Sequence, residues 1–454
     1  MSSHTIKRGF DLRLAGRPEP VLVDAPEPAF VTLETAEFPG IKPKALIEEG
    51  QAVTTGQPLF LDKRDRDVVF CSPATGVATK VEYGERRHLL RVVVELRGKD
   101  EFYLPPADAA SRASPPTSRE QVVRALAGSG LWPLLRQRPL GKMPLTTTVP
   151  VAIFVNGMDT APLAADPAFV TRGREQDLQA GIDLLQRLTP TGKVHLCLRQ
   201  GGQQQDHLRN LRGVEIHEFA GPHPAGLVGT HIAKVRPLKP SEVVFTLRAG
   251  DVARIGEWQR SGRYPQRQIV AVAGSAAPTK RYFRVRQNAP VATLTGGKPL
   301  TGDVRLIDGT VLGGNQVAAG GCLGFLATTL TIIPEGTDQR DLFGWALPQL
   351  GKLSFHRSVF SWLMPKKDYV VDARLNGGHR PIVDIGGWEQ VIALDIHPTF
   401  LVRAIQAGDI EEAVKLGLLE VVEDDVALCT FVDPCKIDVG ALVRRGLDQY
   451  EKEG

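Results

Sequence analysis

The stretch VAIFVNGMDTAPLAADP, residues 151–167, decides the fold expected for this chain. Residues 152–155 are apolar and predict a short buried strand, which runs directly into the turn pair Asn156-Gly157. An Asn-Gly pair tolerates left-handed backbone angles. The residues after it are typical of turns and helix starts, and include Asp159 and Pro162. Because α/β sheets bind ligands where their strands end in such loops, we expect a ligand-type loop here.

Strands and helices alternate from this stretch onwards. Residues 151–155, 193–198 and 214–219 predict strands, and residues 176–188 predict a helix between the first two. This alternation is typical of a Rossmann-like parallel sheet, which we expect within residues 106–257. No GxGxxG motif opens the first helix, so the spacing does not support dinucleotide binding.

A small all-β unit is expected within the N-terminal region, residues 1–105. Short β-prone runs broken by glycines resemble the barrel-sandwich fold of biotinyl and lipoyl carrier domains. Those runs are residues 58–61, 68–71, 77–81 and 89–96. Carrier domains are modified on a lysine at a hairpin tip, and Lys63 lies in such a tip. A solvated, charged hairpin is the favoured interpretation, because acidic and basic neighbours surround this lysine.

Two further units are expected towards the C-terminus. Residues 258–335 hold β-prone runs that fit a small β-grasp domain, with a basic edge formed by Lys280, Arg281, Arg284 and Arg286. A solvated strand face is the default interpretation of that edge, and anionic lipid or a partner is the alternative. The apolar stretch 317–333 fits two buried strands better than a membrane span, because three glycines interrupt it. Residues 336–454 predict a helical bundle, with Thr399 and Asp409 as helix caps.

Composition restricts the class of protein. The chain has 454 residues, 42% of them hydrophobic and 23% charged, which is ordinary for a soluble multidomain protein. A net charge of +4 is far below that of a nucleic-acid-binding surface, so no nucleic-acid partner is expected. The five cysteines are scattered and form no CxxC pair, which argues against a disulfide framework and against a zinc or iron–sulfur site. No apolar segment follows the basic pair near the N-terminus, so no signal peptide is expected.

The roles of one segment and of two histidines need separate interpretation. Residues 129–142, SGLWPLLRQRPLGK, alternate apolar and basic side chains. Such a segment can dock on a partner or cover an amphipathic ligand, or it can clamp two domains together. His223 and His231 have no carboxylate or thiol at a matching spacing, so we interpret them as loop-packing residues rather than metal ligands.

Several long motifs in order identify a resemblance to a known family. They include IKRGFDLRLAGRPEP near the N-terminus and, in order along the chain, SGLWPLLRQRP at 129–139, IFVNGMDTAPLAADP at 153–167, AGPHPAGLVGTH at 220–231, DLFGWALP at 341–348 and ALCTFVDPCK from 427. Together they resemble the A subunit of the sodium-translocating NADH:quinone oxidoreductase. The resemblance spans essentially the whole chain.

The resemblance implies a subunit of a six-subunit translocase in the bacterial inner membrane. That complex passes electrons from NADH to ubiquinone and exports Na+. The A subunit is expected to lie at the cytoplasmic face as a peripheral protein without a transmembrane segment. It is expected to have five partner subunits, above all the membrane-embedded B subunit, and to contribute to ubiquinone binding. NADH, flavins, iron–sulfur clusters and Na+ are expected to be handled by the other subunits, with no cofactor on this one.

The implied fold is similar to that of the flavin- and NADH-binding subunit of respiratory complex I. In those relatives the loop after the first strand carries two acids and lines the flavin pocket. Here it keeps Asn156, Gly157 and Pro162, but Asp159 is the shorter acid and Ala161 replaces the second. We therefore expect a degenerate flavin-type loop. A free-standing NADH- and flavin-binding oxidoreductase is the alternative function.

Quinone contact requires hydrogen-bond donors for two carbonyls and an apolar trough for the isoprenoid tail. The sequence offers candidates for both roles: Phe38, Trp132, Leu135, Arg136, Arg138 and Lys142. The chain also departs from its relatives near the end, where Asp433-Pro434-Cys435-Lys436 stands in place of a Cys-Pro-Gly-Lys turn. This favours a structural turn over a functional cysteine.

Overall fold

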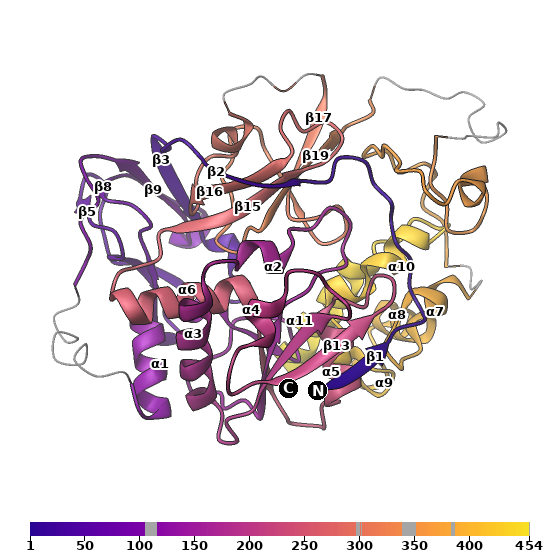
Figure 1. Cartoon of the computed structure of the whole chain (residues 1–454), viewed down its shortest axis with the longest axis horizontal. Coiled ribbons are helices and arrows are strands. Elements are labelled where there is room, and N and C mark those ends of the chain that lie inside the picture. The colour runs from indigo at the N-terminus through magenta and orange to yellow at the C-terminus, as the bar shows by residue number, and fades with distance from the viewer. Residues whose placement is uncertain (105–115, 297–299, 301, 338–350, 383–385, 454) are drawn as a thin grey trace.

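The computed structural model describes residues 1–453 except 105–115, 297–299, 301, 338–350 and 383–385. The motif at 341–348 and the expected boundary at 105 therefore lie outside the described residues. Figure 1 shows a barrel-like β unit, a second β unit and a group of helices arranged around a central α/β unit.

The central sheet has six strands, and it contains the three strands expected from the sequence. Its order is β1 (Ser2–Thr5), β13 (Glu215–Ala220), β12 (Val194–Arg199), β11 (Ala152–Asn156), β14 (Val244–Arg248) and β10 (Arg136–Arg138). All neighbours are parallel except β10, which pairs antiparallel with β14. From β11 the chain proceeds outward to β13 and then returns to β14 on the other side of β11. The order of the strands therefore reverses between β11 and β14, where open α/β sheets place their ligands.

Helices cover both faces of this sheet. On one face α3 (Glu175–Leu188) packs against α6 (Ala249–Ser261), and α1 (Arg119–Gly128) lies beside α3 (Figure 1). The opposite face carries α5 (Val228–Val235). Ser118 caps α1 and forms the expected capping box with Gln121. The short helices α2 (Pro167–Val170) and α4 (Asp206–Arg209) follow β11 and β12.

Glycine is required where α3 and α6 cross. A Cβ atom on Gly256 would lie 1.7 Å from the carbonyl oxygen of Asp177, so the helix backbones could not approach this closely with any larger residue.

The N-terminal β unit consists of two small sheets. One contains β3 (Phe30–Glu34), β9 (Leu89–Leu96), β8 (Gly76–Tyr83) and β5 (Ala52–Val53), and the other contains β4 (Pro43–Ala45), β6 (Pro58–Asp62) and β7 (Asp65–Cys71). Lys63 is exposed at the tip of the β6–β7 hairpin, next to Arg64, which pairs with the buried Asp62. This placement agrees with a solvated hairpin.

The third sheet contains the strands expected between residues 258 and 335, together with one that was not expected. Its order is β18 (Asn315–Val317), β17 (Val304–Asp308), β19 (Thr329–Pro334), β15 (Arg267–Ala273), β16 (Arg281–Arg286) and β2 (Glu19–Asp24). The expectation of a solvated basic edge holds only for the exposed Arg284, because β2 from the N-terminal region pairs with β16 along that edge and Arg286 is buried. Arg284 bonds Asp24 at 3.0 Å, and the buried Arg286 bonds Glu27 and Asp100 at 2.9 Å each.

The expected domain boundaries agree only partly with the sheets. Strands β1 and β2 lie in the N-terminal region but belong to the central and third sheets, and α6 crosses the expected boundary at 257. The apolar stretch 317–333 contains the end of β18 and the start of β19, as expected for strands. Among the described residues, no helix is both long and apolar enough to span a bilayer.

The C-terminal helices form a second core, to which Leu12 and Leu14 of the N-terminal region contribute. These helices are α7 (Gly387–Val391), α8 (Pro398–Ala407), α9 (Ile410–Lys415), α10 (Ala427–Val432) and α11 (Val439–Glu453). Asp409 caps α9 as expected. Thr399 is not a cap, because α8 begins at Pro398 and the N-cap position falls on His397. Proline favours the first helical turn, where its missing N–H has no partner to lose. The Thr399 hydroxyl instead donates to Glu389 at 2.9 Å.

Candidate functional site

A cavity of about 510 Å³ lies where the central sheet, the two β units and the C-terminal helices meet. This volume is within the usual range for small-molecule sites. Its walls come from Asn156 at the end of β11, Arg248 at the end of β14, and segments from the other units. The expected ligand-type loop therefore does line a cavity, at the point where the strand order reverses.

The loop after β11 uses its polar atoms to hold its own shape. The Asn156 amide donates to the Gly226 carbonyl at 2.9 Å, and its oxygen accepts the Met158 N–H at 3.1 Å. The expected left-handed turn at Gly157 is wrong, because this residue does not have a positive φ. The space beside Gly157 is tight instead, since a Cβ there would lie 2.7 Å from Leu198 Cδ2 and would force that buried side chain to shift.

The two histidines of the β13–α5 region pack this loop, as the sequence indicated. His223 Nδ1 lies 3.0 Å from the Thr160 hydroxyl, which also accepts the Gly226 N–H at 2.8 Å. His231 Nε2 lies 2.9 Å from the Ala225 carbonyl oxygen. Burial lowers the pKa of His223 to about 4 and that of His231 to about 3, so both rings are neutral at pH 7.

Five acidic side chains line the cavity, and burial raises the pKa of four of them, Glu37, Asp159, Asp308 and Asp424. The pKa of Glu37 rises to about 8, and those of Asp159 and Asp424 rise to about 6. Asp308 shifts in the same direction, and its carboxylate accepts the Gly324 N–H at 2.7 Å. Asp159 accepts the Ala161 N–H at 2.8 Å. Glu37 is therefore mostly protonated at pH 7 and can donate a hydrogen bond. Of these four acids, sequence reasoning found only Asp159.

Three guanidinium groups complete the polar lining. Arg248 donates to Asp251 at 2.8 Å and to the Leu326 carbonyl at 2.7 Å. Arg138 donates to Asp425 at 2.6 Å. The half-buried Arg136 donates to two backbone carbonyls, those of Pro133 at 2.8 Å and Leu135 at 3.0 Å. Among the described residues, no carboxylate lies within ion-pair distance of Arg136. Burial and the nearby Arg248 charge lower its pKa to about 10, so it remains a cation at pH 7.

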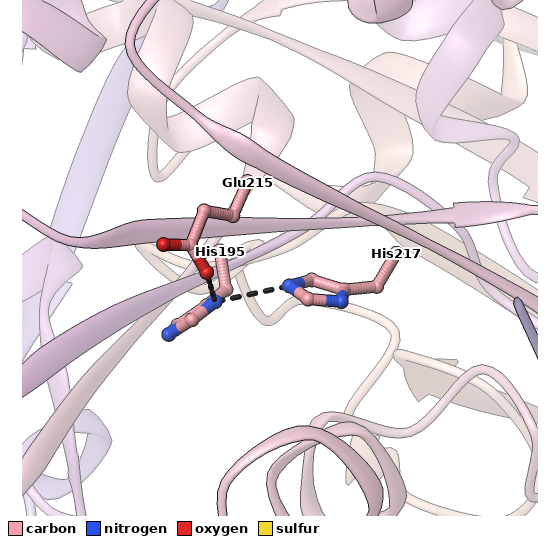
Figure 2. A group of neighbouring side chains, drawn as sticks. All are labelled: His195, Glu215 and His217. Carbon is pink, nitrogen blue, oxygen red and sulfur yellow. Dashed lines mark hydrogen bonds and ion pairs between the residues drawn. The ribbon is translucent and has the colours of Figure 1, made fainter. Parts of the chain in front are cut away.

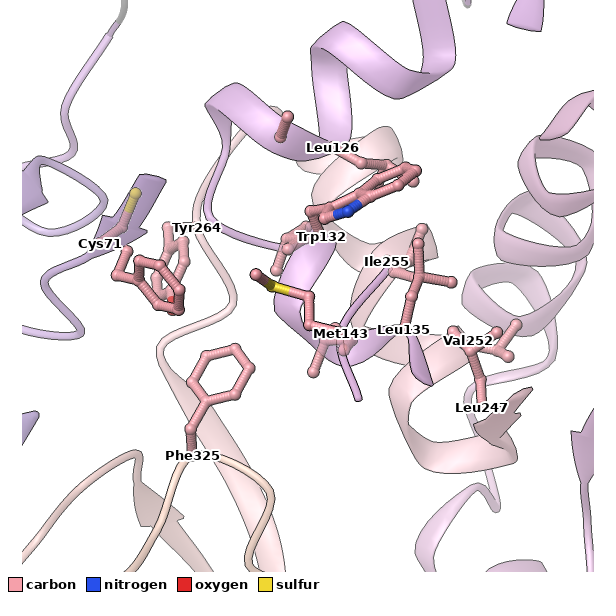
Figure 3. Packing of buried hydrophobic residues seen from close by; sticks show 14 of the residues in the cluster. Cys71, Leu126, Trp132, Leu135, Met143, Leu247, Val252, Ile255, Tyr264 and Phe325 are labelled. Atoms are coloured by element: carbon pink, nitrogen blue, oxygen red, sulfur yellow. The ribbon is translucent and has the colours of Figure 1, made fainter. Parts of the chain in front are cut away.

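The other quinone candidates lie away from the cavity lining. Trp132 and Leu135 are fully buried between α1, α6 and the N-terminal β unit (Figure 3). The Trp132 indole N–H donates to the Pro144 carbonyl at 2.8 Å. Phe38 is buried against Phe70 and Phe325, with ring centroids 4.5 and 5.6 Å away. Of the six candidates, Arg136 and Arg138 line the cavity.

The basic residues of segment 129–142 clamp the α/β unit to the C-terminal helices, which was one of the two interpretations left open. Lys142 lies 2.8 Å from Asp448 and 2.6 Å from Glu451, both on α11. Burial opposes the charge on Lys142, but the bonds to these carboxylates raise its pKa overall. Arg138 reaches Asp425 just before α10. These contacts connect β10 and the loop after it to the helices that form one wall of the cavity.

Residues 433–436, where the sequence departs from the expected Cys-Pro-Gly-Lys turn, form a tight turn. Asp433 is buried and accepts the Ile437 N–H at 2.8 Å, while Lys436 adopts a left-handed φ of 60°. Cys435 is buried, and its carbonyl accepts the Arg380 N–H at 3.0 Å. These contacts agree with a structural turn.

All five cysteines of the chain are free thiols.

Three family models match the chain: "NqrA N-terminal barrel-sandwich hybrid domain" over residues 4–97, "NqrA second alpha/beta domain" over 117–264 and "NQRA C-terminal domain" over 269–319. A protein of Neisseria gonorrhoeae, named as the A subunit of the Na(+)-translocating NADH-quinone reductase, is 41% identical over 455 residues, covering 99% of each chain. The chain belongs to this family of A subunits. Proteins of the same name from Mannheimia succiniciproducens and Yersinia pestis are each 40% identical, covering 99% of this chain and 100% and 99% of their own lengths. The family expected from the sequence motifs is therefore confirmed.

Two solved structures of an NAD+-reducing [NiFe]-hydrogenase are distant matches. The air-oxidized form aligns at 16% identity with a TM-score of 0.35, covering 50% of this chain and 49% of its own. The H2-reduced form aligns at 14% identity with a TM-score of 0.39, covering 77% and 63%. At scores this low, the two structures say nothing about the fold or the site of this chain.

Proposed function

We propose that this chain is a peripheral subunit of the bacterial Na+-translocating NADH:ubiquinone oxidoreductase and that its central cavity binds the ubiquinone head group. The names of relatives 40–41% identical over 99% of the chain support the first part. The position of Arg136 in the cavity wall supports the second. In this proposal NADH, flavins, iron–sulfur clusters and Na+ are handled by the five other subunits, and this chain carries no redox cofactor.

Arg136 is the residue best suited to hold a quinone carbonyl. Its guanidinium is a cation that lines the cavity and bonds only backbone carbonyls among the described residues. A quinone carbonyl accepts hydrogen bonds and carries no charge, so a half-buried guanidinium can bind it without a compensating carboxylate. A hydrogen bond to a charged donor contributes about 1.5–3 kcal/mol. Arg138 and Arg248 are less available, because each is paired with an aspartate.

The remaining lining fits a neutral amphipathic ligand better than a charged one. Four acids in the walls have raised pKa values, and protonated Glu37 can donate to the second quinone carbonyl. Apolar lining comes from Val170, Leu312 and Leu326. A nucleotide phosphate is disfavoured as a ligand, because these carboxylates would repel its negative charge whenever they ionise. In addition, the Asn156 amide is already bonded within its own loop.

An exposed apolar surface offers a docking face for the membrane-embedded B subunit. Trp362, Leu363 and Val370 are 52%, 57% and 60% exposed, and the basic residues Lys366 and Lys367 lie between them in the sequence. Contiguous exposed apolar surface is typical of interaction sites, and these three side chains lie close together in the sequence. We propose that this segment faces the partner at the cytoplasmic surface of the inner membrane.

Substitution of Arg136 in the assembled complex tests the cavity assignment. Arg136→Gln removes the charge and is expected to raise the KM for ubiquinone about 10- to 100-fold, the equivalent of one charge-assisted hydrogen bond. Arg119→Gln is the matched control. Arg119 lies on α1, away from the cavity, and it also donates to two backbone carbonyls. An unchanged KM in the Arg136 variant would refute the assignment.

The alternative of a free-standing NADH- and flavin-binding oxidoreductase makes a different prediction. The purified chain would then be yellow and would oxidise NADH alone. As a cofactor-free subunit of the complex, the chain is instead colourless in visible light, inactive by itself, and copurifies with membrane subunits.

A further inference from the structure

Three metal-ligand side chains meet at the start of β12 and β13, on the sheet face that carries α5 (Figure 2). His195 Nδ1 lies 3.0 Å from His217 Nε2 and 3.4 Å from Glu215 Oε2. All three ligand atoms lie within 4.8 Å of one another. We propose that His195, Glu215 and His217 bind a divalent transition-metal ion, with zinc as the best fit.

The strand pairing places these residues together. Parallel β12 and β13 pair His195 with Glu215 and Cys197 with His217. Alternate residues of a strand face the same side, so Glu215 and His217 project from the same face of β13. Both histidines are buried, and His195 packs against Phe154 with ring centroids 4.7 Å apart. The ligand set is therefore held by two neighbouring strands of a rigid sheet rather than by a loop.

The distances match a tetrahedral site. Zinc bonds nitrogen and carboxylate oxygen at about 2.0–2.2 Å, which places neighbouring ligand atoms of a tetrahedron about 3.3–3.6 Å apart. The separation of 3.4 Å between His195 and Glu215 lies within that range, and the 3.0 Å between the two histidines is slightly shorter. The Glu215 side chain is 51% exposed and can rotate to close the third edge. Its exposure also leaves solvent access for a water molecule as the fourth ligand.

The donor types select the class of ion. Two imidazole nitrogens and one carboxylate suit zinc and its first-row neighbours, whereas Mg2+ and Ca2+ prefer sites made of oxygen alone. Two histidines and one glutamate with one open position also form a known class of zinc site. Zinc is favoured over copper and nickel because it accepts tetrahedral geometry without a preference from its d electrons.

A second contact orients the His217 ring. The Ser2 hydroxyl on β1 lies 2.7 Å from His217 Nδ1 and can accept its proton in a hydrogen bond. With the proton on Nδ1, the Nε2 lone pair points at the site. Hydrogen bonding at the second ring nitrogen is the usual support for a histidine ligand. An ion bound here would therefore also secure the edge strand β1 against β13.

Two features oppose binding and make the proposal testable. In the bound form His195 would carry its proton on Nε2, which is buried without a hydrogen-bond partner among the described residues. Lys193 Nζ lies 3.7 Å from Glu215 Oε1 and competes with a cation for that carboxylate. Without an ion, the same side chains would form only a hydrogen-bonded His–His–Glu group.

Metal titration of the full-length, chelator-treated chain tests the proposal by calorimetry. We expect a single Zn2+ ion per chain, and a visible absorption band typical of tetrahedral geometry when Co2+ is used instead. His217→Ala should abolish binding. Glu215→Gln changes an exposed side chain that the fold does not need, so it should weaken binding without unfolding the chain. Ser2→Ala should weaken binding about tenfold, as expected when a histidine ligand loses the hydrogen bond that orients its ring.

Two further variants separate the proposal from nonspecific effects. Lys193→Gln should tighten Zn2+ binding, because it removes the cation that competes for Glu215. His207→Ala is the matched control: His207 is a partly buried histidine that bonds Thr171 at 2.9 Å elsewhere in the unit, and its loss should leave the affinity unchanged. Absence of stoichiometric binding, or binding that survives both His217→Ala and Glu215→Gln, would overturn the proposal. A normal quinone KM in the same variants would separate this site from the cavity.

Discussion

The ion pair between Arg138 and Asp425 gives the sharpest prediction for stability. The two residues are 287 positions apart, and their guanidinium and carboxylate groups meet at 2.6 Å. The side chains are only 7% and 3% exposed. We expect Asp425→Ala to destabilise the contact between the α/β unit and the C-terminal helices, because it leaves the Arg138 charge buried without its carboxylate.

The magnitude follows from the burial of the pair. Removal of one partner from a buried ion pair costs about 3–5 kcal/mol, much of it the penalty of the unpaired charge. Asp425 also accepts the Val422 N–H at 3.0 Å, and this bond is lost in the same variant. At about 2–4 °C per kcal/mol for units of this size, the melting temperature should fall by about 10 °C.

Thermal melting of three variants, compared with the unchanged chain, measures this effect. The double variant Arg138→Met with Asp425→Leu replaces both charges with apolar groups and should recover most of the loss. Asp24→Ala is the control, because its pair with Arg284 is 69% and 47% exposed and should contribute less than about 1 kcal/mol. The reasoning would be refuted if Asp425→Ala melted within about 2 °C of the unchanged chain, or if the double variant were less stable than the single one.

Three more predictions follow from the cavity and the core. The pKa of Glu37 rises from 4.5 to about 8 on folding, so between these two pH values the folded chain binds more protons than the unfolded chain. The free energy of unfolding therefore falls as the pH rises through this window, by up to about 1.4 kcal/mol per pH unit. Glu37→Gln should remove that slope from melting curves measured between pH 5 and 8. Gly157→Ala places a Cβ 2.7 Å from Leu198 Cδ2 and should cost about 1–3 kcal/mol in denaturant unfolding. Trp132→Phe should lower the melting temperature yet leave the KM for quinone unchanged, because Trp132 lies in the core.

Local features of the fold could be predicted from the sequence. The capping box at Ser118 and Gln121 depends on residues three positions apart, and the strand over 152–156 depends on one apolar run. The positions of β1 and β2 could not be predicted, because these strands pair with β13 and β16 about 200 or more residues away. No local pattern specifies a pairing of that kind.

The site could be predicted only in part for the same reason. The loop after β11 was found because a strand, a turn and a helix start follow one another in sequence. Arg248 and Glu37 were missed, since only the folded chain brings them to that loop. A signal for β14 did exist in the apolar run at 243–247, which would have located the reversal of strand order. Trp132 and Leu135 were chosen for their apolar character, which equally suits a core.

A structure of the assembled complex with a bound quinone-site inhibitor tests the central claim most directly. We predict that the inhibitor occupies the cavity at the ends of β11 and β14, with its carbonyl within hydrogen-bond distance of the Arg136 guanidinium. An inhibitor bound elsewhere, with Arg136 still bonded only to the Pro133 and Leu135 carbonyls, would contradict the assignment of the quinone site to this cavity.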